Sequence, residues 1–401
     1  MTQAGNRIVW LASEEGIRLA SFAAAMPDDP LKRMTALRRL TTADRASAIV
    51  EHLTLRRRAR QRFPRANSMY FTSTGLDQAT VPAVARYHAK LLQGAAAVLD
   101  AGCGIGSDLG EIAAFCRVLA VDINEEVIAC ARLNVANNAE HDIRFLVADV
   151  MTMSAHHLSR GGIDALFCDP ARRQTADGTT HRVRSASLSS PPLTWLLDAA
   201  RTFPEVLIKL SPAIPDEELL QFGGTAQFVS YGGQCREALA LPNRNHAPFA
   251  AVQIFDDGSH EELTALVEAH AGTVSQGNWL YEPDPAAIRA HLVDTLGALT
   301  NTHRMVDGIA YLLGEELVNN PWLTPYRVIE PVACDVRTLR AWQKRHKRRI
   351  GVVKSRGSTP TPEAMLTRLQ DRSLDSSDPV VLVLARGREG VTAVLCEPPT
   401  L

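Results

Sequence analysis

Three acidic residues, each at the end of a short apolar run, give the clearest indication of chemistry in the sequence. They are Asp100, Asp122 and Asp149, and the last two are followed by the apolar residues Ile123 and Val150. An acid that ends the second strand of a nucleotide-binding fold, about twenty residues after a glycine-rich turn, accepts hydrogen bonds from the ribose hydroxyls. Asp149 can accept one from an adenine amine, and the two apolar side chains can lie against the ring. The pattern therefore predicts a nucleoside site.

A glycine-rich turn follows the first of these acids. Gly102, Gly104 and Gly106 stand at alternate positions, which allows the backbone to turn tightly and to approach a ligand without Cβ clashes. The spacing G-x-G-x-G differs from the G-x-G-x-x-G fingerprint of dinucleotide sites, so a pyrophosphate is disfavoured. S-adenosylmethionine (SAM) has an ammonium and a carboxylate instead, and Asp100 can bind the ammonium, so we predict SAM as the cofactor. In the alternative interpretation the turn is an ordinary βα turn and the aspartates are helix N-caps. For any single residue this interpretation is as good as a cofactor site, but it does not explain the ordered set of glycines and acids.

The apolar run that ends at Cys168 is followed by Asp169, Pro170, Ala171, Arg172 and Arg173. This segment is similar to the substrate loop of amino-methyltransferases, in which an acid, asparagine or serine precedes two prolines and an aromatic residue. In that loop the side-chain oxygen and the proline carbonyl accept hydrogen bonds from an exocyclic amine, and positioning supplies much of the rate. We predict catalytic roles for Asp169, Pro170 and Arg172, although Ala171 and Arg172 replace the second proline and the aromatic residue. Arg172 and Arg173 either bind a substrate phosphate or carboxylate or form structural ion pairs.

Two further segments border the same expected site. Lys209 lies near the end of the fifth apolar run, and it either faces the substrate cleft or is a solubilising residue of an edge strand. Ser190, followed by Pro191 and Pro192, precedes an apolar helix and is interpreted as its N-cap.

Short apolar runs that alternate with amphipathic stretches predict a parallel sheet built from βα units. Strands are expected at residues 96–101, 118–123, 143–148, 163–168 and 206–210, with helices at 108–115, 125–137 and 193–203. Right-handed crossovers bring all the strand carboxyl ends to one edge, where such folds bind ligands. Strands expected at 227–231, 237–241 and 249–255 are too closely spaced for crossover helices, so antiparallel pairing is expected there. The predicted fold class is α/β, with a Rossmann-like sheet.

The chain is long enough for roughly two or three domains. Residues 8–63 have apolar positions at helical spacing and predict a helical N-terminal module, assigned to 1–65. The sheet domain is assigned to 66–275. Tyr281–Pro285 contains two prolines that break a continuing helix, so a domain boundary is expected close by. Helical and strand patterns after it predict a small α+β domain at 276–401.

The composition of the 401-residue chain, 46% apolar and 22% charged, is that of a globular protein. Seven scattered cysteines without a C-x-x-C pair favour reduced thiols in the cytoplasm over disulfides or a zinc site. Apolar runs as long as a membrane span are absent from the sequence, so we expect neither a membrane nor a metal partner, and the oligomeric state is left open. The net charge of -1 excludes binding of nucleic acid by bulk charge alone but permits local basic patches.

Several segments together resemble one protein family. They are FTSTGLDQAT (Phe71–Thr80), VLDAGCGIG, AVDINEEVIACARLN, DPARR, IKLSP (Ile208–Pro212), YGGQCREALAL, LYEPDPAAIRA (Leu280–Ala290) and GVVKSRGSTPTPEAM. The chain resembles class I SAM-dependent methyltransferases with a C-terminal THUMP-like domain, and its core is similar to trimethylguanosine synthase-type RNA methyltransferases. The resemblance implies that Thr80 contacts the cofactor and that the substrate is RNA. Cap-guanine methylation is not implied, because the tryptophan that follows the catalytic prolines in the cap enzymes is absent.

Two basic clusters offer surfaces for an RNA backbone. The first comprises Arg56, Arg57, Arg58, Arg60, Arg62 and Arg65, and the second comprises Lys344, Arg345, His346, Lys347, Arg348 and Arg349. The alternative is that each cluster is a solvated helix end favoured by the helix macrodipole. Two rival functions also fit the sequence. One is a small-molecule methyltransferase whose acceptor lies in a closed pocket built by the N-terminal helices, and the other is a non-catalytic SAM-binding or RNA-binding module.

Overall fold

The computed structural model describes residues 3–136, 141–171, 173–176, 179–182, 189–244, 247–265, 269, 271–357, 361–370 and 378–399. The chain forms two compact units. The first unit consists of Met1–Gln227, Glu237–Pro248 and Ile254–His260, and the second unit consists of Phe228–Arg236, Phe249–Gln253 and Glu261–Leu401. The division passes through several strands, whereas the sequence analysis placed it between residues 275 and 276.

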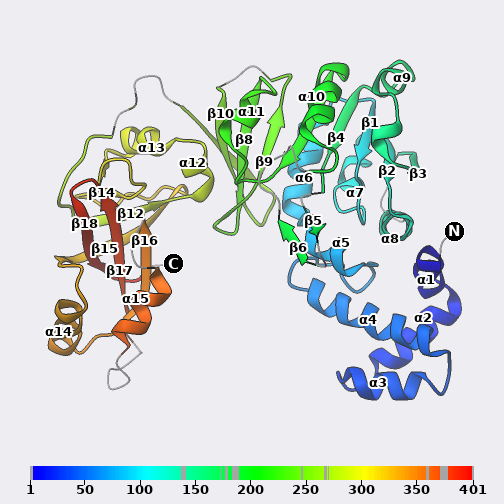
Figure 1. The fold of residues 1–401 in the computed structure, drawn as a ribbon, viewed down its shortest axis with the longest axis horizontal. Coiled ribbons are helices and arrows are strands. Elements are labelled where there is room, and N and C mark those ends of the chain that lie inside the picture. The colour runs from blue at the N-terminus through cyan, green and yellow to red at the C-terminus, as the bar shows by residue number, and fades with distance from the viewer. Residues whose placement is uncertain are drawn as a thin grey trace. The chain divides into compact units, whose positions relative to one another are not determined.

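The first unit is built on a parallel sheet (Figure 1). Its parallel strands are β1 (Ala97–Ala101), β2 (Arg117–Asp122), β3 (Ile143–Val147), β4 (Ala165–Cys168) and β7 (Glu205–Leu210). Next to β7 lies β9 (Gln234–Leu241), which runs antiparallel to it. With β8 (Thr225–Tyr231), β10 (Phe249–Ile254) and β11 (His260–Thr264), the full order is β11-β10-β8-β9-β7-β4-β1-β2-β3. The α/β fold class with a Rossmann-like parallel sheet is confirmed.

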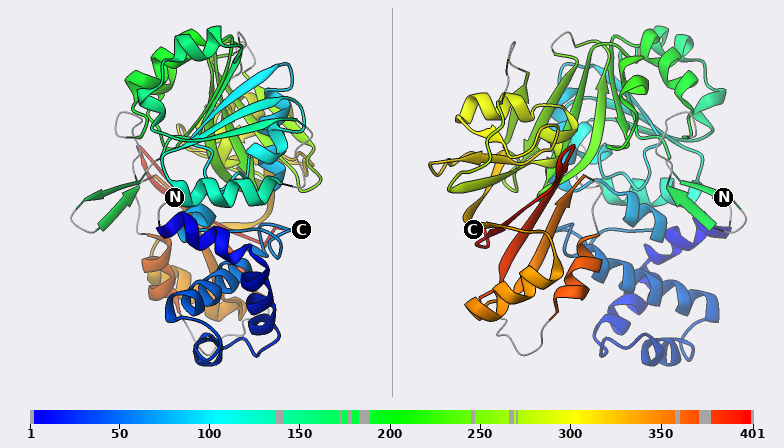
Figure 2. Two further views of the ribbon diagram at one scale, coloured as in Figure 1. Left: turned by 90° about the vertical axis from the view of Figure 1, so that its right-hand side faces the viewer. Right: turned by 60° about the vertical axis from the view of Figure 1, so that its left-hand side comes forward.

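Helices cover both faces of this sheet (Figure 2). On one face α6 (Pro82–Leu91), α7 (Leu109–Ile112) and α8 (Glu125–Val135) pack in sequence, and on the other α9 (Ala155–Arg160) packs on α10 (Leu193–Thr202). Because both faces are covered, every residue of β1 and of β4 is buried. Shorter elements complete the unit: the 3₁₀ helix η1 (Val150–Thr152), α11 (Asp216–Leu220) and a hairpin of β5 (Arg173–Ala176) and β6 (Thr179–Arg182).

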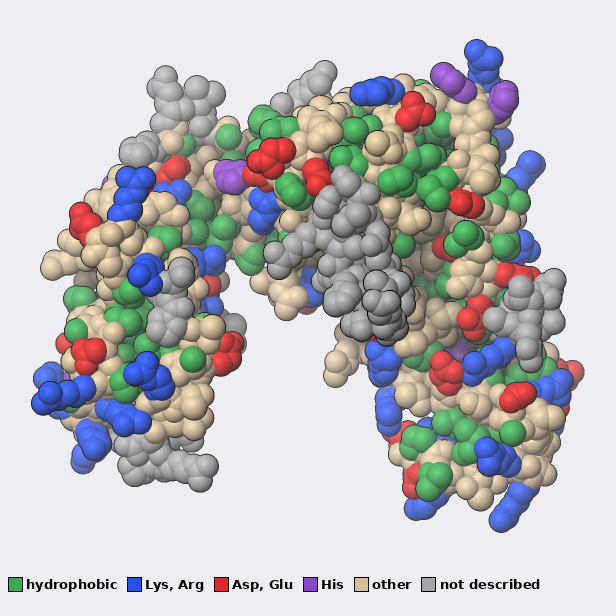
Figure 3. Space-filling model, viewed as in Figure 1, with side chains coloured by type: hydrophobic (Ala, Val, Ile, Leu, Met, Phe, Trp, Pro, Cys, Tyr) green, Lys and Arg blue, Asp and Glu red, His purple; other side chains and the backbone are tan. Residues whose placement is uncertain are grey.

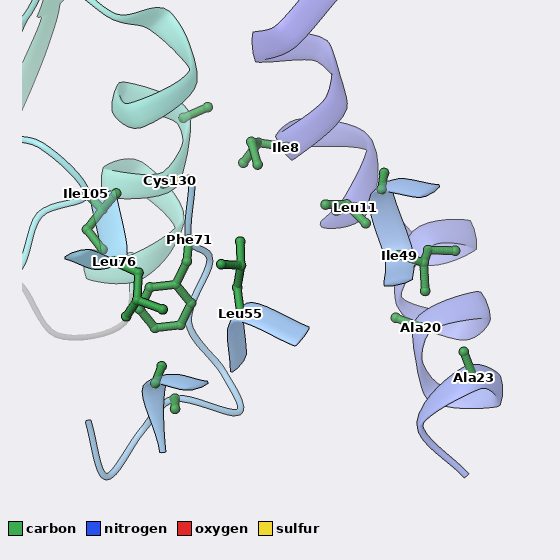
Figure 4. Packing of buried hydrophobic residues seen from close by; sticks show 14 of the residues in the cluster. Ile8, Leu11, Ala20, Ala23, Ile49, Leu55, Phe71, Leu76, Ile105 and Cys130 are labelled. Atoms are coloured by element: carbon green, nitrogen blue, oxygen red, sulfur yellow. The ribbon is translucent and has the colours of Figure 1, made fainter. Parts of the chain in front are cut away.

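The N-terminal helices share a hydrophobic core with the glycine-rich turn. They are α1 (Gln3–Leu11), α2 (Glu14–Ala24), α3 (Pro30–Leu37), α4 (Ala43–Ala59) and α5 (Ser73–Gln78). Figure 4 shows Phe71 and Leu76 beside Ile105, with Leu55 of α4 next to Phe71. The α5 helix packs so closely that a Cβ atom at Gly75 would lie 2.4 Å from the Ile105 side chain. These helices therefore help to fix the turn that holds the glycines.

The second unit contains a seven-stranded sheet in the order β13-β14-β12-β15-β18-β17-β16. Its elements are β12 (Trp279–Pro283), α12 (Pro285–Arg289), α13 (Val293–Thr300), β13 (His303–Arg304), β14 (Leu312–Gly314), β15 (Leu323–Val332), α14 (Val336–His346), β16 (Ile350–Arg356), α15 (Pro362–Leu369), β17 (Val380–Gly387) and β18 (Gly390–Cys396). Tyr281, expected at a domain boundary, is instead fully buried in the interior strand β12. The expectation fails because Pro283 only ends a strand and Pro285 begins a helix, positions that proline tolerates.

Within the part of the chain that the structure describes, none of the helices combines the length and the apolar character needed to cross a bilayer. The same residues contain no group of three or more His, Cys, Asp or Glu side chains arranged to hold a metal ion.

Candidate active site

A cleft of about 690 Å³ lies at the carboxyl ends of the parallel strands in the first unit. After β3 the chain returns to the other side of β1, so β1 pairs with β2 on one side and with β4 on the other. Such a reversal of strand order opens a crevice at the sheet edge, where ligands bind in this class of fold. The N-terminal helices contribute further walls, among them Ile8 of α1, His52 of α4 and Gly75 of α5.

Most of the site residues predicted from the sequence line this cleft. They are Thr80, Asp100, Gly102, Gly104, Asp122, Ile123, Asp149, Val150, Asp169 and Pro170. Gly106 differs, because it faces α8, where a Cβ atom would lie 3.2 Å from the Cα of Ala131. Arg172 lies outside the described residues. The third glycine thus serves the packing of a helix, while the first two border the cleft.

Gly102 and Gly104 keep the strand-to-helix turn open. Both have positive φ values, 93° and 54°, in the left-handed region that glycine adopts without steric cost. A Cβ atom at Gly102 would lie 3.2 Å from the Asp169 carbonyl oxygen, whereas one at Gly104 would meet no atom within 4 Å. The Gly104 backbone therefore borders open space that a ligand can enter.

The Asp122 carboxylate is held by the backbone at the end of β2. It accepts hydrogen bonds from the N–H groups of Gly104 at 3.1 Å and of Asn124 at 2.9 Å, one on each oxygen. Burial raises the pKa of Asp122 by more than these bonds lower it. Asn124, and not Asp122, caps α8, so the N-cap interpretation does not apply to this acid. The adjacent Ile123 side chain is 72% exposed on the cleft wall.

Asp149 caps η1 and also lines the cleft. Its side chain accepts a hydrogen bond from the N–H of Met151 at 2.9 Å. The N-cap interpretation is therefore right for Asp149, but a cap at the mouth of the cleft can still present its other oxygen to a ligand.

Asp100 is fully buried in β1, and neither of its carboxylate oxygens has a hydrogen-bond partner among the described residues. Burial raises the pKa of Asp100 well above its ordinary value, and the nearby charges of Asp108, Asp122 and Asp169 raise it further. Leaving a buried polar group unsatisfied costs about 1–3 kcal/mol, and more for a charged group. A cationic ligand in the cleft would remove this cost.

Behind the Asp169 loop, the side chains of Lys209, Thr80, Asp108, His88 and Glu237 form what we call the buried ring. The Lys209 ammonium donates to the Thr80 hydroxyl at 2.8 Å, which in turn donates to Asp108 Oδ2 at 2.6 Å. His88 lies between two acids, with Nδ1 2.7 Å from Asp108 Oδ1 and Nε2 2.5 Å from Glu237 Oε1. Glu237 Oε2 closes the ring at 3.9 Å from Lys209 Nζ.

The buried ring contains two cations and two anions. Burial disfavours the charged form of His88, but the carboxylates of Glu237 and Asp108 outweigh it and raise its pKa to about 9. His88 is therefore an imidazolium that donates from both nitrogens. Burial also opposes the charges of the other three groups, yet their neighbours raise the pKa of Lys209 and lower the pKa values of Asp108 and Glu237. The ring is electrically neutral, which makes the burial of four charges tolerable.

Lys209 also binds Asp169, which lies outside the buried ring. Its Nζ donates to Asp169 Oδ2 at 2.5 Å. The β7 strand lies between β4 and β9, and Lys209 is only 3% exposed. The interpretation of Lys209 as a solubilising residue on an edge strand is therefore wrong. Its ammonium lies behind the cleft wall, where it supports Asp169.

Ser190 is not a helix cap, contrary to the sequence interpretation. Pro192 occupies the N-cap position of α10, and Ser190 instead pairs with Ala171 through two backbone hydrogen bonds of 2.8 and 3.1 Å. Ser190 and Pro191 line the cleft beside Pro170.

Sequence reasoning missed His88, Asp108 and Glu237. The available indication was weak: Glu237 stands directly before the apolar run 238–241, and His88 lies among buried residues of α6. The partners of His88 are 20 and 149 positions away along the chain. Local spacing therefore could not reveal the ring.

Comparison with known proteins identifies the family of this chain. A family model described as a methyltransferase domain matches residues 98–181, the segment that contains β1 to β4 and Asp169. A Mycobacterium tuberculosis protein described as an uncharacterized S-adenosylmethionine-dependent methyltransferase is 32% identical over 371 residues, and the match covers 88% of this chain and 98% of that protein. This chain belongs to the S-adenosylmethionine-dependent methyltransferases. The methyltransferase is thus an enzyme with SAM as its cofactor, which confirms both predictions and removes the non-catalytic alternative. The same match recurs in two strains, CDC 1551 / Oshkosh and ATCC 25618 / H37Rv.

The methyltransferase also shares its fold with a solved structure. A crystal structure from Porphyromonas gingivalis W83, provisionally described as a methyltransferase, superposes with a TM-score of 0.76 at 17% identity, covering 97% of this chain and 99% of that one. At this identity the likeness shows the fold alone. A second family model, described as a domain of unknown function, matches residues 6–59, which lie in the N-terminal helices of the methyltransferase.

Proposed function

We propose that this methyltransferase transfers the methyl group of SAM to an exocyclic amine of an RNA base held by Asp169 and Pro170. The observation that supports this most is the position of Asp169, whose side chain is 21% exposed and lines the cleft. It follows β4 directly beside the Gly102 turn, where its carbonyl oxygen is 3.2 Å from the Cβ position of that glycine. An acid placed next to the cofactor turn can hold an amine in line with a methyl group.

The residues that line the cleft fit SAM. We assign the SAM ammonium to Asp100, whose unpaired carboxyl group needs a cation. We assign the ribose hydroxyls to Asp122, because backbone N–H groups already orient both of its oxygens. Ile123 and Val150 would lie against the adenine ring, with Asp149 accepting from its amine. Bound there, SAM would supply a methyl group on a positively charged sulfur.

The charge of the cleft supports binding of a cation. SAM has a net charge of about +1, because its sulfonium adds to a zwitterionic amino acid, whereas the product lacks the sulfonium charge. The buried ring is neutral, so Asp169 and any ionised Asp100 make the cleft negative. Thr80, implied by the family resemblance to contact SAM, already donates to Asp108 and accepts from Lys209. It would reach the cofactor through its methyl group or its remaining lone pair.

The chain's own groups can complete the transfer. The amine nitrogen forms a bond to the methyl carbon, the sulfur keeps the electron pair of the broken C–S bond, and the nitrogen then releases one proton. The Asp169 carboxylate accepts a hydrogen bond from the amine and can take that proton. The Pro170 carbonyl accepts a second hydrogen bond, which turns the nitrogen lone pair toward the methyl group.

The first basic cluster, Arg56 to Arg65, does not contribute to the RNA proposal. Its members mostly hold the N-terminal helices to the segment before β1. Arg57 pairs with Asp28, Arg58 pairs with Asp77, Arg56 donates to the Met69 carbonyl, Arg60 donates to Asn67, and Arg62 donates to the carbonyls of Leu76 and Ala79. These contacts favour a structural role for the cluster.

The second basic cluster, at the end of α14 in the second unit, supports an RNA partner. Lys344, Arg345 and Lys347 are exposed, as are Arg337 and Arg340 earlier on the same helix. Figure 3 shows Lys and Arg side chains gathered over this helix, at the lower left of the view. Several exposed cations on one helix can contact successive phosphates. The assignment of residues 276–401 as a THUMP-like domain belongs to the same proposal.

One member of the second cluster is engaged elsewhere. The Arg348 guanidinium pairs with Asp378 at 2.8 Å and with Glu397 at 2.6 Å. We therefore assign phosphate contacts to the exposed residues of α14 and not to Arg348.

The test compares methylated nucleosides in total RNA from cells with and without the protein. A methylated nucleoside that is missing without the protein, and that purified enzyme and labelled SAM restore, identifies the acceptor. Asp169→Ala should abolish this transfer while SAM binding persists. Lys344→Glu with Arg345→Glu should weaken RNA binding and reduce its salt dependence. The matched control is Arg38→Glu with Arg39→Glu, which makes the same charge change at exposed positions of the first unit. Unchanged RNA in cells without the protein would refute the RNA proposal.

A small-molecule amine is the second candidate acceptor. The observation that favours it is the extent of the cleft, which continues from the strand ends to Ile8 and Leu11 of α1 and to His52 and Leu55 of α4. Helices that wall a cleft in this way can enclose a small substrate. Transfer from labelled SAM to the small-molecule fraction of a cell extract, and not to RNA, would support this candidate.

A further inference from the structure

We infer that Lys209 is a positioning residue for methyl transfer, because it fixes the Asp169 side chain where it faces the substrate amine. The inference rests on the proposed role of Asp169 in the acceptor site. It holds whether the amine belongs to RNA or to a small molecule.

The two strands bring Lys209 and Asp169 together. The β4 and β7 strands are parallel with Cys168 opposite Ile208, so the next residue on each, Asp169 and Lys209, are neighbours. The Lys209 side chain is 4% exposed and the Asp169 side chain is 21% exposed. The ammonium therefore lies behind the acid, and the acid reaches the cleft. Their contact uses Asp169 Oδ2, and no described residue binds Oδ1, which is left for an amine.

The buried ring determines where this ammonium lies. Lys209 Nζ has three neighbours: Thr80 Oγ1 at 2.8 Å, Asp169 Oδ2 at 2.5 Å and Glu237 Oε2 at 3.9 Å. An ammonium has three N–H groups, so these neighbours fix its position. Thr80 and Glu237 are held in turn by Asp108 and His88. Asp169 is thus attached to a rigid support of five side chains.

Stability alone does not explain this lysine. An apolar residue in the interior strand β7 would avoid the desolvation of an ammonium and of its partners. Replacing a buried ion pair by well-packed apolar residues is often neutral or stabilising. The ring is also neutral without Asp169, so Asp169 adds a negative charge that no further cation among the described side chains balances. We therefore attribute the presence of Lys209 to its contact with Asp169, which it holds in position at the rim of the cleft.

The experiment replaces Lys209 by Met, which removes the ammonium and keeps most of the side-chain volume. Methyl transfer from labelled SAM is measured with two acceptor pools, the RNA and the small-molecule fraction of cells that lack the protein. We expect kcat to fall roughly 10- to 100-fold, since misplacing a reacting group has effects of this size. The Kd for SAM, measured by calorimetry, should stay close to that of the wild type. A fall in kcat at unchanged SAM affinity is the result expected of a positioning residue, because a damaged cleft would weaken SAM binding as well.

Two variants separate positioning from simple destabilisation. Lys209→Arg keeps the cation and should retain a higher kcat than Lys209→Met; it also remains informative where Lys209→Met does not fold. Leu196→Ala leaves a cavity under α10 and destabilises the protein without touching the cleft, so its kcat and its Kd for SAM, measured below its melting temperature, should match the wild type. A Lys209→Met enzyme with unchanged kcat, or with a kcat that Lys209→Arg does not restore in part, would overturn the inference. Normal transfer by Asp169→Ala would instead overturn the proposed acceptor site.

Discussion

Raising the pH should destabilise the folded methyltransferase through His88 in the buried ring. Burial by itself lowers the pKa of His88, but Glu237 and Asp108 outweigh it and raise the pKa from 6.5 to about 9. Because the folded state binds the proton more tightly, the stabilisation is complete below pH 6.5 and is lost as the pH rises through 9. A difference of about 2.5 pKa units, at 1.36 kcal/mol each, corresponds to roughly 3 kcal/mol of stability.

Urea unfolding followed by circular dichroism at pH 6.0 and pH 8.5 measures this loss. At pH 8.5 the folded imidazolium is still largely protonated, so we expect the free energy of unfolding to fall by roughly 2 kcal/mol. The range stops at pH 8.5 because cysteine thiols ionise above it in the unfolded chain. Burial raises the pKa of such thiols in the folded protein, for example that of Cys168, and they would add a loss of their own.

Glu237→Gln supplies the matched variant. It removes the carboxylate at His88 Nε2 but keeps an oxygen that can accept the hydrogen bond, so the pKa of His88 should fall and the loss between pH 6.0 and pH 8.5 should shrink. Glu217→Gln, at an exposed acid of α11, is the control and should leave the loss unchanged. Equal losses in the wild type and in Glu237→Gln would refute the assignment of His88 as an imidazolium between two carboxylates.

Four further outcomes follow from the cleft and its walls. Gly104→Ala and Gly106→Ala should each cost about 1–2 kcal/mol of stability, because both glycines have a positive φ. Thermal unfolding should show the larger loss of stability for Gly106→Ala, because Gly106 packs on α8. Calorimetry should show the larger loss of SAM affinity for Gly104→Ala, because Gly104 borders the cleft. Ile123→Ser should weaken SAM binding with little change in the melting temperature, because this side chain is already 72% exposed. Asp100→Asn should raise the free energy of unfolding at pH 8, because burial raises the pKa of Asp100 well above its ordinary value and the folded state therefore opposes an ionisation that the unfolded chain allows. The same change should weaken SAM binding, and a loss of stability would contradict the unpaired acid. Burial, and then the charge of Arg56, lower the pKa of His52 to about 3. The free energy of unfolding should therefore decrease as the pH falls below 6.5, because only the unfolded chain then binds a proton at His52. Urea titrations of His52→Gln should show a smaller decrease over the same pH range.

The cofactor acids could be predicted from the sequence because strand polarity follows from chain order. Asp100 lies near the end of one apolar run, Asp122 ends another and Asp149 follows a third, and parallel strands joined by crossovers bring such ends to one edge. All three acids line the same cleft. The role of the glycines was predicted from their G-x-G-x-G spacing alone. Spacing cannot distinguish Gly104, which borders the cleft, from Gly106, which packs on a helix.

The sequence could not determine which basic residues are available to a partner. Arg57 and Lys344 look alike in their clusters, but Arg57 pairs with Asp28, which lies 29 residues away, while Lys344 is exposed. The sequence also could not determine the limits of the compact units. A domain boundary was expected near Tyr281 because two prolines follow it, yet Tyr281 is buried in β12, between β14 and β15 of the second sheet. Both outcomes depend on residues that pack from distant parts of the chain.

By itself the sequence determined the parallel sheet, the edge where a ligand binds and the acids that stand there, since these follow from periodicity and connection length. Only the tertiary structure decided the buried ring and the support of Asp169 by Lys209. Antiparallel pairing of β7 with β9 places Lys209 opposite Leu239, two residues from Glu237, and α6 brings His88 to the same point. A lone lysine, histidine or glutamate is expected at the surface, because burying one charge costs several kcal/mol. That expectation reverses only when packing brings opposite charges within hydrogen-bond distance, and long-range packing is not encoded in any local pattern.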